Sequence, residues 1–265
     1  MTEENILKVE TKNGVGIITL NRPDKLNSFN DELTFQLQDA LKEMERNPEI
    51  RALVITGEGR GFSAGQDLQS RSISHDKGER PSLGNSIRRR YNPIISKIRK
   101  MEKPVIAAVN GVAAGAGASL AFACDYRIVS ENASFIQSFT KVGLVPDSGS
   151  TFLLPRLIGA TRAFDLMLSA DKLSAAEAKD LNLVNQVVKQ EEVLSTALSL
   201  AEKLAAGPTK AFGLTKRAFN RAIFPDLDEL LEYEAGLQEI AGRSDDFEEG
   251  VKAFVEKRAP VYTGK

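Results

Sequence analysis

A run dense in glycine and alanine near the middle of the chain constrains the fold more than any other stretch. Residues 105–109 read VIAAV, an apolar strand pattern, and Gly115-Ala116-Gly117 follows and opens the small apolar run 118–124, ASLAFAC. That run is long enough for about two helical turns. The predicted helix therefore begins at a backbone with little side-chain cover, where N–H groups attract an anion or a developing oxyanion.

Asp147 is a carboxylate in an apolar and small-residue setting. It follows the apolar segment 142–145 and Pro146, and it opens DSGST, residues 147–151. An aspartate after a proline commonly caps the next helix. The alternative is a general base whose pKa is raised by apolar neighbours such as Leu144, Val145 and Phe139. The pattern alone leaves both interpretations open.

Length and charge exclude several classes of protein. The chain has 265 residues, of which 42% are hydrophobic, so it can bury the core of one large domain or of one domain with an appendage. Its formal net charge of −1 provides no field for nucleic acid or an acidic membrane surface. The weakly polar stretch 107–124 is built of glycine and alanine and is barely long enough to span a bilayer. We therefore expect neither nucleic-acid nor membrane partners.

Cysteine and histidine are nearly absent. Cys124 is the single cysteine, which excludes an intrachain disulfide and indicates a reducing compartment, and its place in an apolar run predicts a small core residue. The first residues, MTEENILKVE, lack the basic and apolar layout of an export signal. We therefore expect a cytoplasmic protein. Because His75 and Cys124 are the only soft ligands in the sequence, we expect no metal site.

Local patterns predict an α/β core followed by an α-helical C-terminal region. The runs 7–13 and 15–21 flank Asn13-Gly14, which predicts a β-hairpin. The order strand, glycine turn, helix, strand occurs twice, once ending at Ala64 and once at Ala116. Other predicted elements are a helix over 31–47 capped by Ser28 or Asn30, a strand over 52–57, a glycine-dense turn over 57–68, a mobile polar loop over 70–84, a helix over 85–103, a strand over 184–188 and helices from 191 onward.

Two motifs suggest enzymes that the rest of the chain does not support. Residues 61–65, GFSAG, fit the G-x-S-x-G elbow of serine hydrolases. Such an enzyme needs a histidine after its acid, whereas the only histidine, His75, follows the serine in a polar loop. The glycine turns at 57–59 and 115–117 both lack the third glycine of the dinucleotide fingerprint, so a nicotinamide dehydrogenase is weakly supported.

What remains is two small-residue turns, each after a strand, and one carboxylate. Two backbone donors aimed at one oxygen form an oxyanion hole, in which losing one donor costs about 2.7–4 kcal/mol of transition-state stabilisation. Such a site suits chemistry that passes through an enolate while a single acid/base group moves a proton.

The sequence resembles the crotonase superfamily, the enoyl-CoA hydratase/isomerase family, over nearly its whole length. Four segments in order carry the resemblance: NRPDKLNSFN at 21–30, GFSAGQDL at 61–68, NGVAAGAGASLAFACD at 110–125 and EEGVKAFVEKRAP at 248–260. The resemblance implies an α/β spiral of ββα units over 1–205 that binds acyl-CoA, and a C-terminal helical region over 206–265 that makes a homotrimer or a dimer of trimers. Coenzyme A would be part of the substrate, with no separate cofactor.

The resemblance also implies roles for individual residues. The backbone N–H groups of Ala64 and Ala116 would be the oxyanion donors. Phe139 would help to keep the pocket dry. The CoA loop residues would be Arg22 and Lys25 near the phosphates and Gln66, Asp67 and Leu68 near the adenine. Two solvated loop charges are the alternative for Arg22 and Lys25.

Departures from the hydratase pattern narrow the implied reaction. The two glutamates of hydratases align with Ser119 and Phe139, neither of which is a base at neutral pH. Asp147 aligns instead with the aspartate of dienoyl-CoA isomerases and ring-epoxide isomerases. Residues 86–95 and 138–156 look most like the branch that converts 1,2-epoxyphenylacetyl-CoA to its oxepin form. The resemblance therefore implies an acyl-CoA isomerase that forms an oxepin, shifts an enoyl double bond, or does both.

Four alternatives remain beside an isomerase of this kind. One is a hydratase of atypical mechanism, and another is a non-catalytic relative that binds acyl-CoA. A third is the serine hydrolase suggested by Ser63. An aromatic acyl-CoA dehalogenase also uses an aspartate at this position, but those relatives rely on a histidine and a tryptophan, and this chain has no tryptophan.

Overall fold

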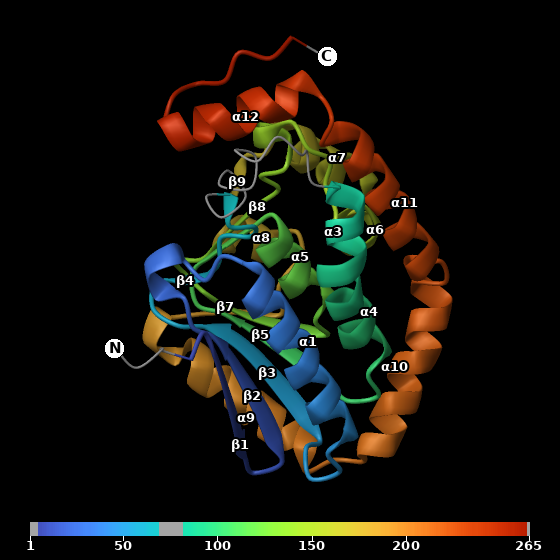
Figure 1. Ribbon diagram of the computed structural model, residues 1–265. Coiled ribbons are helices and arrows are strands. Elements are labelled where there is room, and N and C mark those ends of the chain that lie inside the picture. Colours follow the sequence, from blue (N-terminus) through green and yellow to red (C-terminus); the bar gives the residue numbers. More distant parts are fainter. Residues whose placement is uncertain (1–4, 69–81, 264–265) are drawn as a thin grey trace.

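Two β-sheets form the core of the protein (Figure 1), as seen in a computed structural model that describes residues 5–68 and 82–263. Within these residues the larger sheet has six strands, in the order β1 (Leu7–Lys12), β2 (Val15–Leu20), β3 (Ala52–Gly57), β5 (Val105–Val109), β7 (Tyr126–Ser130) and β10 (Gln186–Val188). The smaller sheet has four, in the order β4 (Gly61–Ser63), β6 (Val112–Ala114), β8 (Ser134–Ile136) and β9 (Lys172–Ser174).

The predicted hairpin is confirmed at β1 and β2. The two strands pair antiparallel, with Lys12 opposite Val15. Asn13 and Gly14 both have positive φ, 51° and 76°, as a primed two-residue turn requires. The chain then continues through η1 (Pro23–Lys25) into α1 (Asp31–Arg46), and Asn30 caps α1 by accepting from Leu33 N at 2.9 Å.

The rest of the core is a spiral in which each turn adds one strand to each sheet. The pairs β3–β4, β5–β6 and β7–β8 place their first strand in the larger sheet and their second in the smaller sheet, parallel to the preceding turn. Helices follow each pair: α3 (Leu83–Arg90) and α4 (Asn92–Lys100), then α5 (Ala116–Ala123), then α6 (Ser150–Ile158) and α7 (Ala160–Ser169). The expected spiral of ββα units is therefore confirmed.

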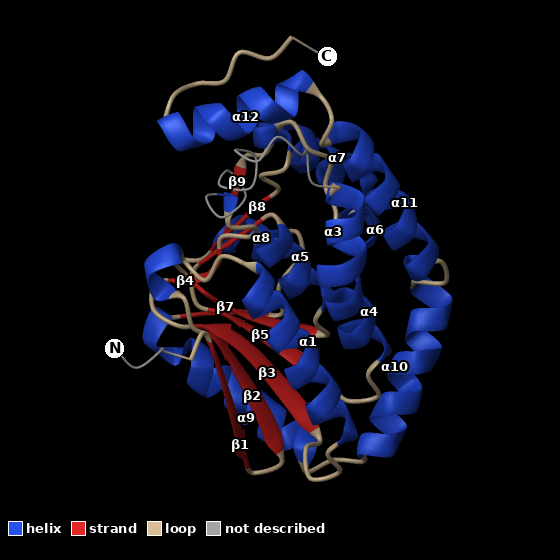
Figure 2. Ribbon diagram, viewed as in Figure 1, coloured by secondary structure: helices blue, strands red, loops and turns tan. Residues whose placement is uncertain are grey.

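Helices cover both faces of the larger sheet (Figure 2). Alternate residues of β3 serve the two faces: Leu53 and Ile55 join the main core, and Ala52 and Val54 pack with α9 (Val193–Ala205) on the other side. Burial on both faces explains why the central strands are continuously apolar. Between α7 and α9, the chain forms α8 (Ala175–Asp180) and the end strand β10.

One predicted helix, 85–103, is two helices in the structure. α3 ends at Arg90 and α4 begins at Asn92, with Pro93 in the first turn of α4. A proline is accepted there but interrupts the interior of a helix, so the break follows from the sequence. The predicted mobile loop 70–84 extends two residues too far, because Leu83 and Gly84 belong to α3. Residues 69–81, including His75, lie outside the described residues.

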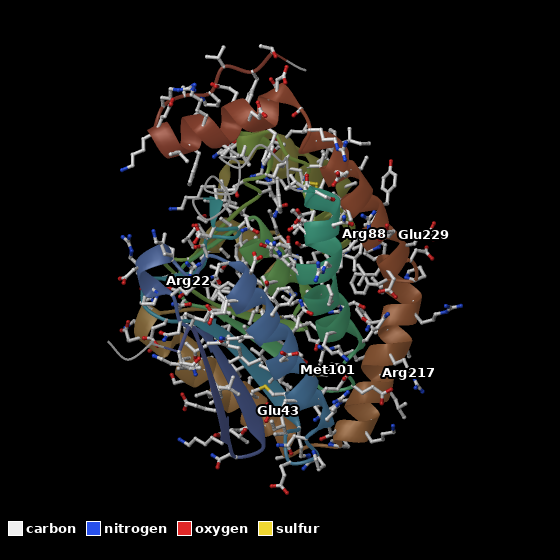
Figure 3. The ribbon with its side chains drawn as sticks, in the orientation of Figure 1. Arg22, Glu43, Arg88, Met101, Arg217 and Glu229 are labelled. Carbon is white, nitrogen blue, oxygen red and sulfur yellow. The ribbon has the colours of Figure 1, made fainter. Side chains whose placement is uncertain are left out.

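Three helices make up the C-terminal region: α10 (Thr209–Ile223), α11 (Leu227–Ala241) and α12 (Asp245–Glu256). α11 runs beside α3, and Arg88 of α3 pairs with Glu232 of α11 at 2.6 Å. Figure 3 shows Arg88 and Glu229 on the side where these helices meet. α12 packs against η2 (Thr140–Val142). Among the described helices, none combines the length and apolar character that a membrane span requires.

Candidate active site

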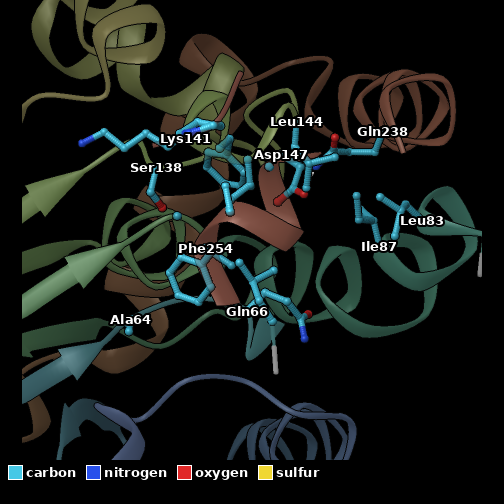
Figure 4. A pocket seen from close by; sticks show the side chains of 18 of the residues that line it. Ala64, Gln66, Leu83, Ile87, Ser138, Lys141, Leu144, Asp147, Gln238 and Phe254 are labelled. Carbon is cyan, nitrogen blue, oxygen red and sulfur yellow. Dashed lines mark hydrogen bonds between the residues drawn. The ribbon is translucent and has the colours of Figure 1, made fainter. Parts of the chain in front are cut away.

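A cavity of about 290 Å³ opens where the glycine turns, α11 and α12 converge (Figure 4). Its walls are mainly apolar, and Asp147 is the only carboxylate among the described residues that line it. Phe139 and Phe254 provide aromatic surface. The full lining is Ala64, Gln66, Leu68, Leu83, Ile87, Tyr91, Gly115, Ala116, Ser138, Phe139, Lys141, Val142, Leu144, Asp147, Gln238, Gly250, Ala253, Phe254, Arg258 and Pro260.

The first glycine turn offers a different donor from the one predicted. Ala64 lines the cavity, but its N–H donates to Leu26 O at 2.9 Å. The Ala64 assignment is therefore corrected, because this N–H is already bonded within the protein. The N–H of Gln66 makes no hydrogen bond to any residue that the structure describes, and Gln66 also lines the cavity. Its neighbours on both sides are fixed: Phe29 N donates to Gly65 O at 2.7 Å and Asp67 N to Phe29 O at 2.9 Å.

The second glycine turn places Ala116 at the first position of α5. Gly115, with φ 49°, turns the chain out of β6, and its N–H donates to Ile136 O at 2.9 Å. Within the described chain the Ala116 N–H has no hydrogen-bond acceptor, so it remains open at the positive end of the helix dipole. Because α5 is buried along its entire length, the direction of this N–H is set by the core.

Two glycines bring the turns together. A Cβ on Gly65 would lie 2.7 Å from Ala114 O and 3.4 Å from Ala116 N. A Cβ on Gly117 would lie 2.3 Å from Ser63 O. Any side chain at these positions would push the turns apart, so the sequence needs glycine at both. The backbone of the first turn is thus held against the start of α5.

Asp147 is 7% exposed and hydrogen-bonded at both carboxylate oxygens. Oδ1 accepts from Ser148 Oγ at 2.7 Å, and Oδ2 accepts from Gln238 Nε2 at 2.7 Å. Figure 4 shows Asp147 beside Gln238 and Leu144. The alternative that Asp147 is the helix cap is wrong, because Gly149 occupies the N-cap position of α6. Asp147 instead faces the cavity with its apolar wall.

Ser119 and Phe139 are the residues that the family resemblance aligns with the glutamates of hydratases. Ser119 is fully buried, and its hydroxyl lies 3.3 Å from Gly115 O and 3.2 Å from Asp147 O, both acceptors. It links the start of α5 to the Asp147 turn and does not line the cavity. Phe139 forms part of the cavity wall. Neither side chain supplies a second acid.

The predicted CoA loop residues are only partly brought together at the cavity. Gln66 and Leu68 line it, whereas Arg22, Lys25 and Asp67 do not. The Arg22 guanidinium pairs with Asp67 at 2.9 Å and donates to Ser28 O at 2.5 Å. The alternative of a solvated charge is therefore wrong for Arg22, although Lys25 is exposed on η1. Figure 3 shows Arg22 beside η1, away from α11.

Glu234 and Gln238 of α11 were missed by sequence reasoning. Each is 1% exposed. Glu234 accepts from Gly149 N at 2.7 Å and from the N–H of Thr151 at 3.1 Å, so it takes the role of cap for α6. Burial raises the pKa of Glu234 to about 7. The signal was present in the sequence, since both residues fall at helical spacing from Leu227 and Leu231 on the buried stripe of α11.

The geometry does not support Ser63 as the nucleophile of a serine hydrolase. Ser63 is fully buried, and its hydroxyl donates to Asn27 O at 2.9 Å, so it does not face the cavity as a nucleophile. Cys124 is buried, and burial raises the pKa of its thiol to about 12, which confirms its expected place in the core. Over residues 5–68 and 82–263 no three His, Cys, Asp or Glu side chains are grouped as metal ligands.

Known proteins are similar to this chain in both sequence and fold. The sequence profile of the family described as Enoyl-CoA hydratase/isomerase matches residues 10–265. The chain therefore belongs to the enoyl-CoA hydratase/isomerase family, the crotonase superfamily, and is an enzyme of that family. It is 50% identical, over 95% of this chain and 96% of the relative, to the 1,2-epoxyphenylacetyl-CoA isomerase of Escherichia coli (strain K12).

One further relative and one solved structure bear the name of a hydratase, and a second solved structure bears the name of an isomerase. A probable enoyl-CoA hydratase of Rhodobacter capsulatus is 40% identical, with 98% of each chain covered. An enoyl-CoA hydratase from Mycobacterium avium subsp. paratuberculosis K-10 superimposes with a TM-score of 0.87 at 36% identity, covering 98% of this chain and 99% of that one. A monofunctional enoyl-CoA isomerase from M. smegmatis gives a TM-score of 0.69 at 32% identity, covering 82% and 93%.

Proposed function

We propose that this protein isomerises an acyl-CoA thioester, with Asp147 as the group that moves the proton. The observation that carries the proposal is that Asp147 is the only carboxylate among the described residues lining the cavity. Addition of water by the two-acid route needs a second acid or base, and Ser119 and Phe139 stand where the family's hydratases have theirs. An isomerisation needs only one group that takes a proton and returns it.

In this mechanism the thioester oxygen accepts hydrogen bonds from the N–H groups of Gln66 and Ala116. Removing a proton from the acyl chain converts the thioester to an enolate, and the two donors stabilise the charge on its oxygen. Asp147 takes the proton as a carboxylate and returns it to another carbon, so the product has the mass of the substrate. Phe139 and the apolar wall exclude water that would otherwise compete.

For the acyl group we propose a ring epoxide related to epoxyphenylacetyl-CoA, converted to its oxepin, with a shift of an enoyl double bond as a second reaction. The 50% identity to a 1,2-epoxyphenylacetyl-CoA isomerase supports this substrate class. The aromatic side chains of Phe139 and Phe254 on the cavity wall suit a flat ring. Arg22, Lys25 and Asp67 remain candidates for contacts to the nucleotide part of coenzyme A.

The experiment is to incubate the purified protein separately with a 3-enoyl-CoA, a 2-enoyl-CoA and enzymatically generated epoxyphenylacetyl-CoA, and to identify products by mass spectrometry. Isomers of unchanged mass support the proposal. A product heavier by one water would show hydration and overturn it. Binding of the thioesters with no product would identify a non-catalytic relative.

We also propose that the protein assembles as a homotrimer or a dimer of trimers through its C-terminal region. Large apolar side chains are exposed on α7, α10 and α11. Those with more than half of their surface exposed are Phe164, Leu168, Phe219, Tyr233 and Ile240. Large exposed apolar side chains such as those of α10 and α11 in the C-terminal region are typical of a surface covered in an oligomer.

A further inference from the structure

Gln238 is a buried amide whose two ends both contact the Asp147 segment. Its Nε2 donates to Asp147 Oδ2 at 2.7 Å, and its Oε1 accepts from Val145 N at 3.1 Å. The backbone N–H of Val145 can only donate, so the carbonyl end of the amide must face it. The amide end is therefore committed to Asp147. With 1% of Gln238 exposed, water does not replace either bond.

Glu234 lies one helical turn before Gln238 and holds the other side of the same segment. It accepts from Gly149 N at 2.7 Å and Thr151 N at 3.1 Å. Residues 145–151 are thus held by α11 on both sides of Asp147. The segment needs such support, because Ser148 has φ 56° and Gly149 has φ 77°, conformations that a free chain rarely adopts in succession.

α11 is itself anchored to the α/β core independently of the cavity. Asn92 of α4 donates through Nδ2 to Leu231 O at 2.9 Å. Arg88 of α3 pairs with Glu232 at 2.6 Å. These contacts fix the helix, and Gln238 then transmits its position to the carboxylate.

We propose that Gln238 is a positioning residue that sets the plane of the Asp147 carboxylate and favours its charged form. This inference rests on the proposed function, in which Asp147 moves the proton. Two donors, Ser148 Oγ on Oδ1 and Gln238 Nε2 on Oδ2, hold the plane of the carboxylate at the wall of the cavity. A donor to the charged form also lowers the pH at which a base becomes active.

Two variants distinguish the donor end of the Gln238 amide from its acceptor end. Gln238→Met keeps the size of the side chain and removes both bonds. Gln238→Glu keeps an oxygen for the Val145 N–H and replaces the donor to Asp147 with a second carboxyl group. Asn92→Ala is the matched control, because it removes a bond that anchors α11 and leaves the bonds of Gln238 in place.

We expect Gln238→Met to lower kcat by about 10–100-fold with KM within about twofold, since a misplaced reacting group loses rate more than binding. The acid limb of the pH profile of kcat/KM should move up by about one pH unit in Gln238→Met, and further in Gln238→Glu, where two carboxyl groups share one site. Lys141 and Arg258 on the cavity wall and Glu234 behind the turn are common to all variants, so differences between variants report on Gln238.

A kcat and an acid limb like those of the wild type in Gln238→Met would overturn the inference, as would the same losses in Asn92→Ala. If either Gln238 variant fails to fold, the other still reports, because each removes the amide that donates to Asp147. Turnover by Asp147→Asn measured in parallel keeps the two proposals apart. An active Asp147→Asn protein would overturn the proposed function, whereas an inactive one together with an unaffected Gln238→Met would overturn only the role of Gln238.

Discussion

Gly117 and Ser63 meet backbone to backbone where the two glycine turns join, so closely that a Cβ on Gly117 would lie 2.3 Å from Ser63 O. One residue belongs to α5 and the other to β4, from successive turns of the spiral. Their contact fixes the separation of the Gln66 and Ala116 N–H groups. The proposed oxyanion site is thus set by close backbone packing and not by side-chain chemistry.

Gly117→Ala should lower kcat by about 10²–10³-fold, because moving α5 away from β4 displaces one of the two oxyanion donors. Steady-state kinetics with circular dichroism measures this. Ala116→Pro provides a second test that removes the N–H itself at a position where helices accept proline. Wild-type kcat in both variants would show that the two turns are not the oxyanion site.

Asp147→Asn should lower turnover by about 10²–10⁴-fold, the usual contribution of an acid/base group. The amide keeps the shape of the carboxylate but does not accept a proton. Affinity for a non-reactive acyl-CoA, measured by calorimetry, should stay within a few-fold of the wild type. Retained turnover would remove Asp147 from the mechanism.

The stability of the wild type should fall as the pH rises through 7, because burial raises the pKa of Glu234 to about 7 from 4.5. The folded state holds this proton more tightly than the unfolded state, so the stabilisation is full below about pH 4.5 and is lost toward higher pH, amounting to at most about 3 kcal/mol. Urea unfolding of the wild type and Glu234→Gln from pH 5 to pH 8 should show this loss only in the wild type. Parallel curves would contradict it.

Ser63→Ala should retain activity within a few-fold, because the hydroxyl is bonded to Asn27 O and Gly65 N and not directed at a substrate. The lost bonds should reduce the free energy of unfolding by about 1–3 kcal/mol. Activity assays and urea unfolding measure the two effects. Complete loss of activity in a folded Ser63→Ala protein would revive the serine hydrolase.

Ile240→Asp should break the proposed assembly into smaller species, because it places a charge on an apolar side chain that is 71% exposed on α11. Val9→Asp is the matched control, since Val9 is also an exposed apolar residue but lies on β1. Analytical ultracentrifugation compares the two with the wild type. A wild-type protein that sediments as a monomer would contradict the proposed oligomer.

Local signals predicted most of the fold and pointed to two parts of the candidate site. The hairpin at Asn13-Gly14, the central strands and the short helix opened at Ala116 each depend on neighbours in sequence. The position of Asp147 after Pro146 and an apolar segment is also a signal from neighbours in the sequence. Pro93 was a local signal for the break between α3 and α4. The prediction of one helix over 85–103 missed it because the apolar residues recur at helical spacing on both sides of Pro93.

The parts of the candidate site that the sequence did not predict depend on hydrogen bonds between residues far apart in the chain. Whether Ala64 or Gln66 has a free N–H depends on Leu26, which lies in an earlier loop and takes the Ala64 N–H. The support of Asp147 by Gln238 joins positions that are far apart in the chain. A buried Glu or Gln on an amphipathic helix shows that a polar partner exists, but only the fold shows which one.

α11 has one face bonded to the Asp147 segment through Glu234 and Gln238, and its opposite face carries the exposed Tyr233 and Ile240. A short rigid helix transmits a displacement from one face to the other. In the proposed assembly, a partner on the outer face would therefore act on Asp147, the group proposed to move the proton. By thermodynamic reciprocity, occupation of the cavity must change the affinity for that covering partner by the same factor. Subunit association and substrate binding would then be coupled equilibria, joined by two turns of one helix.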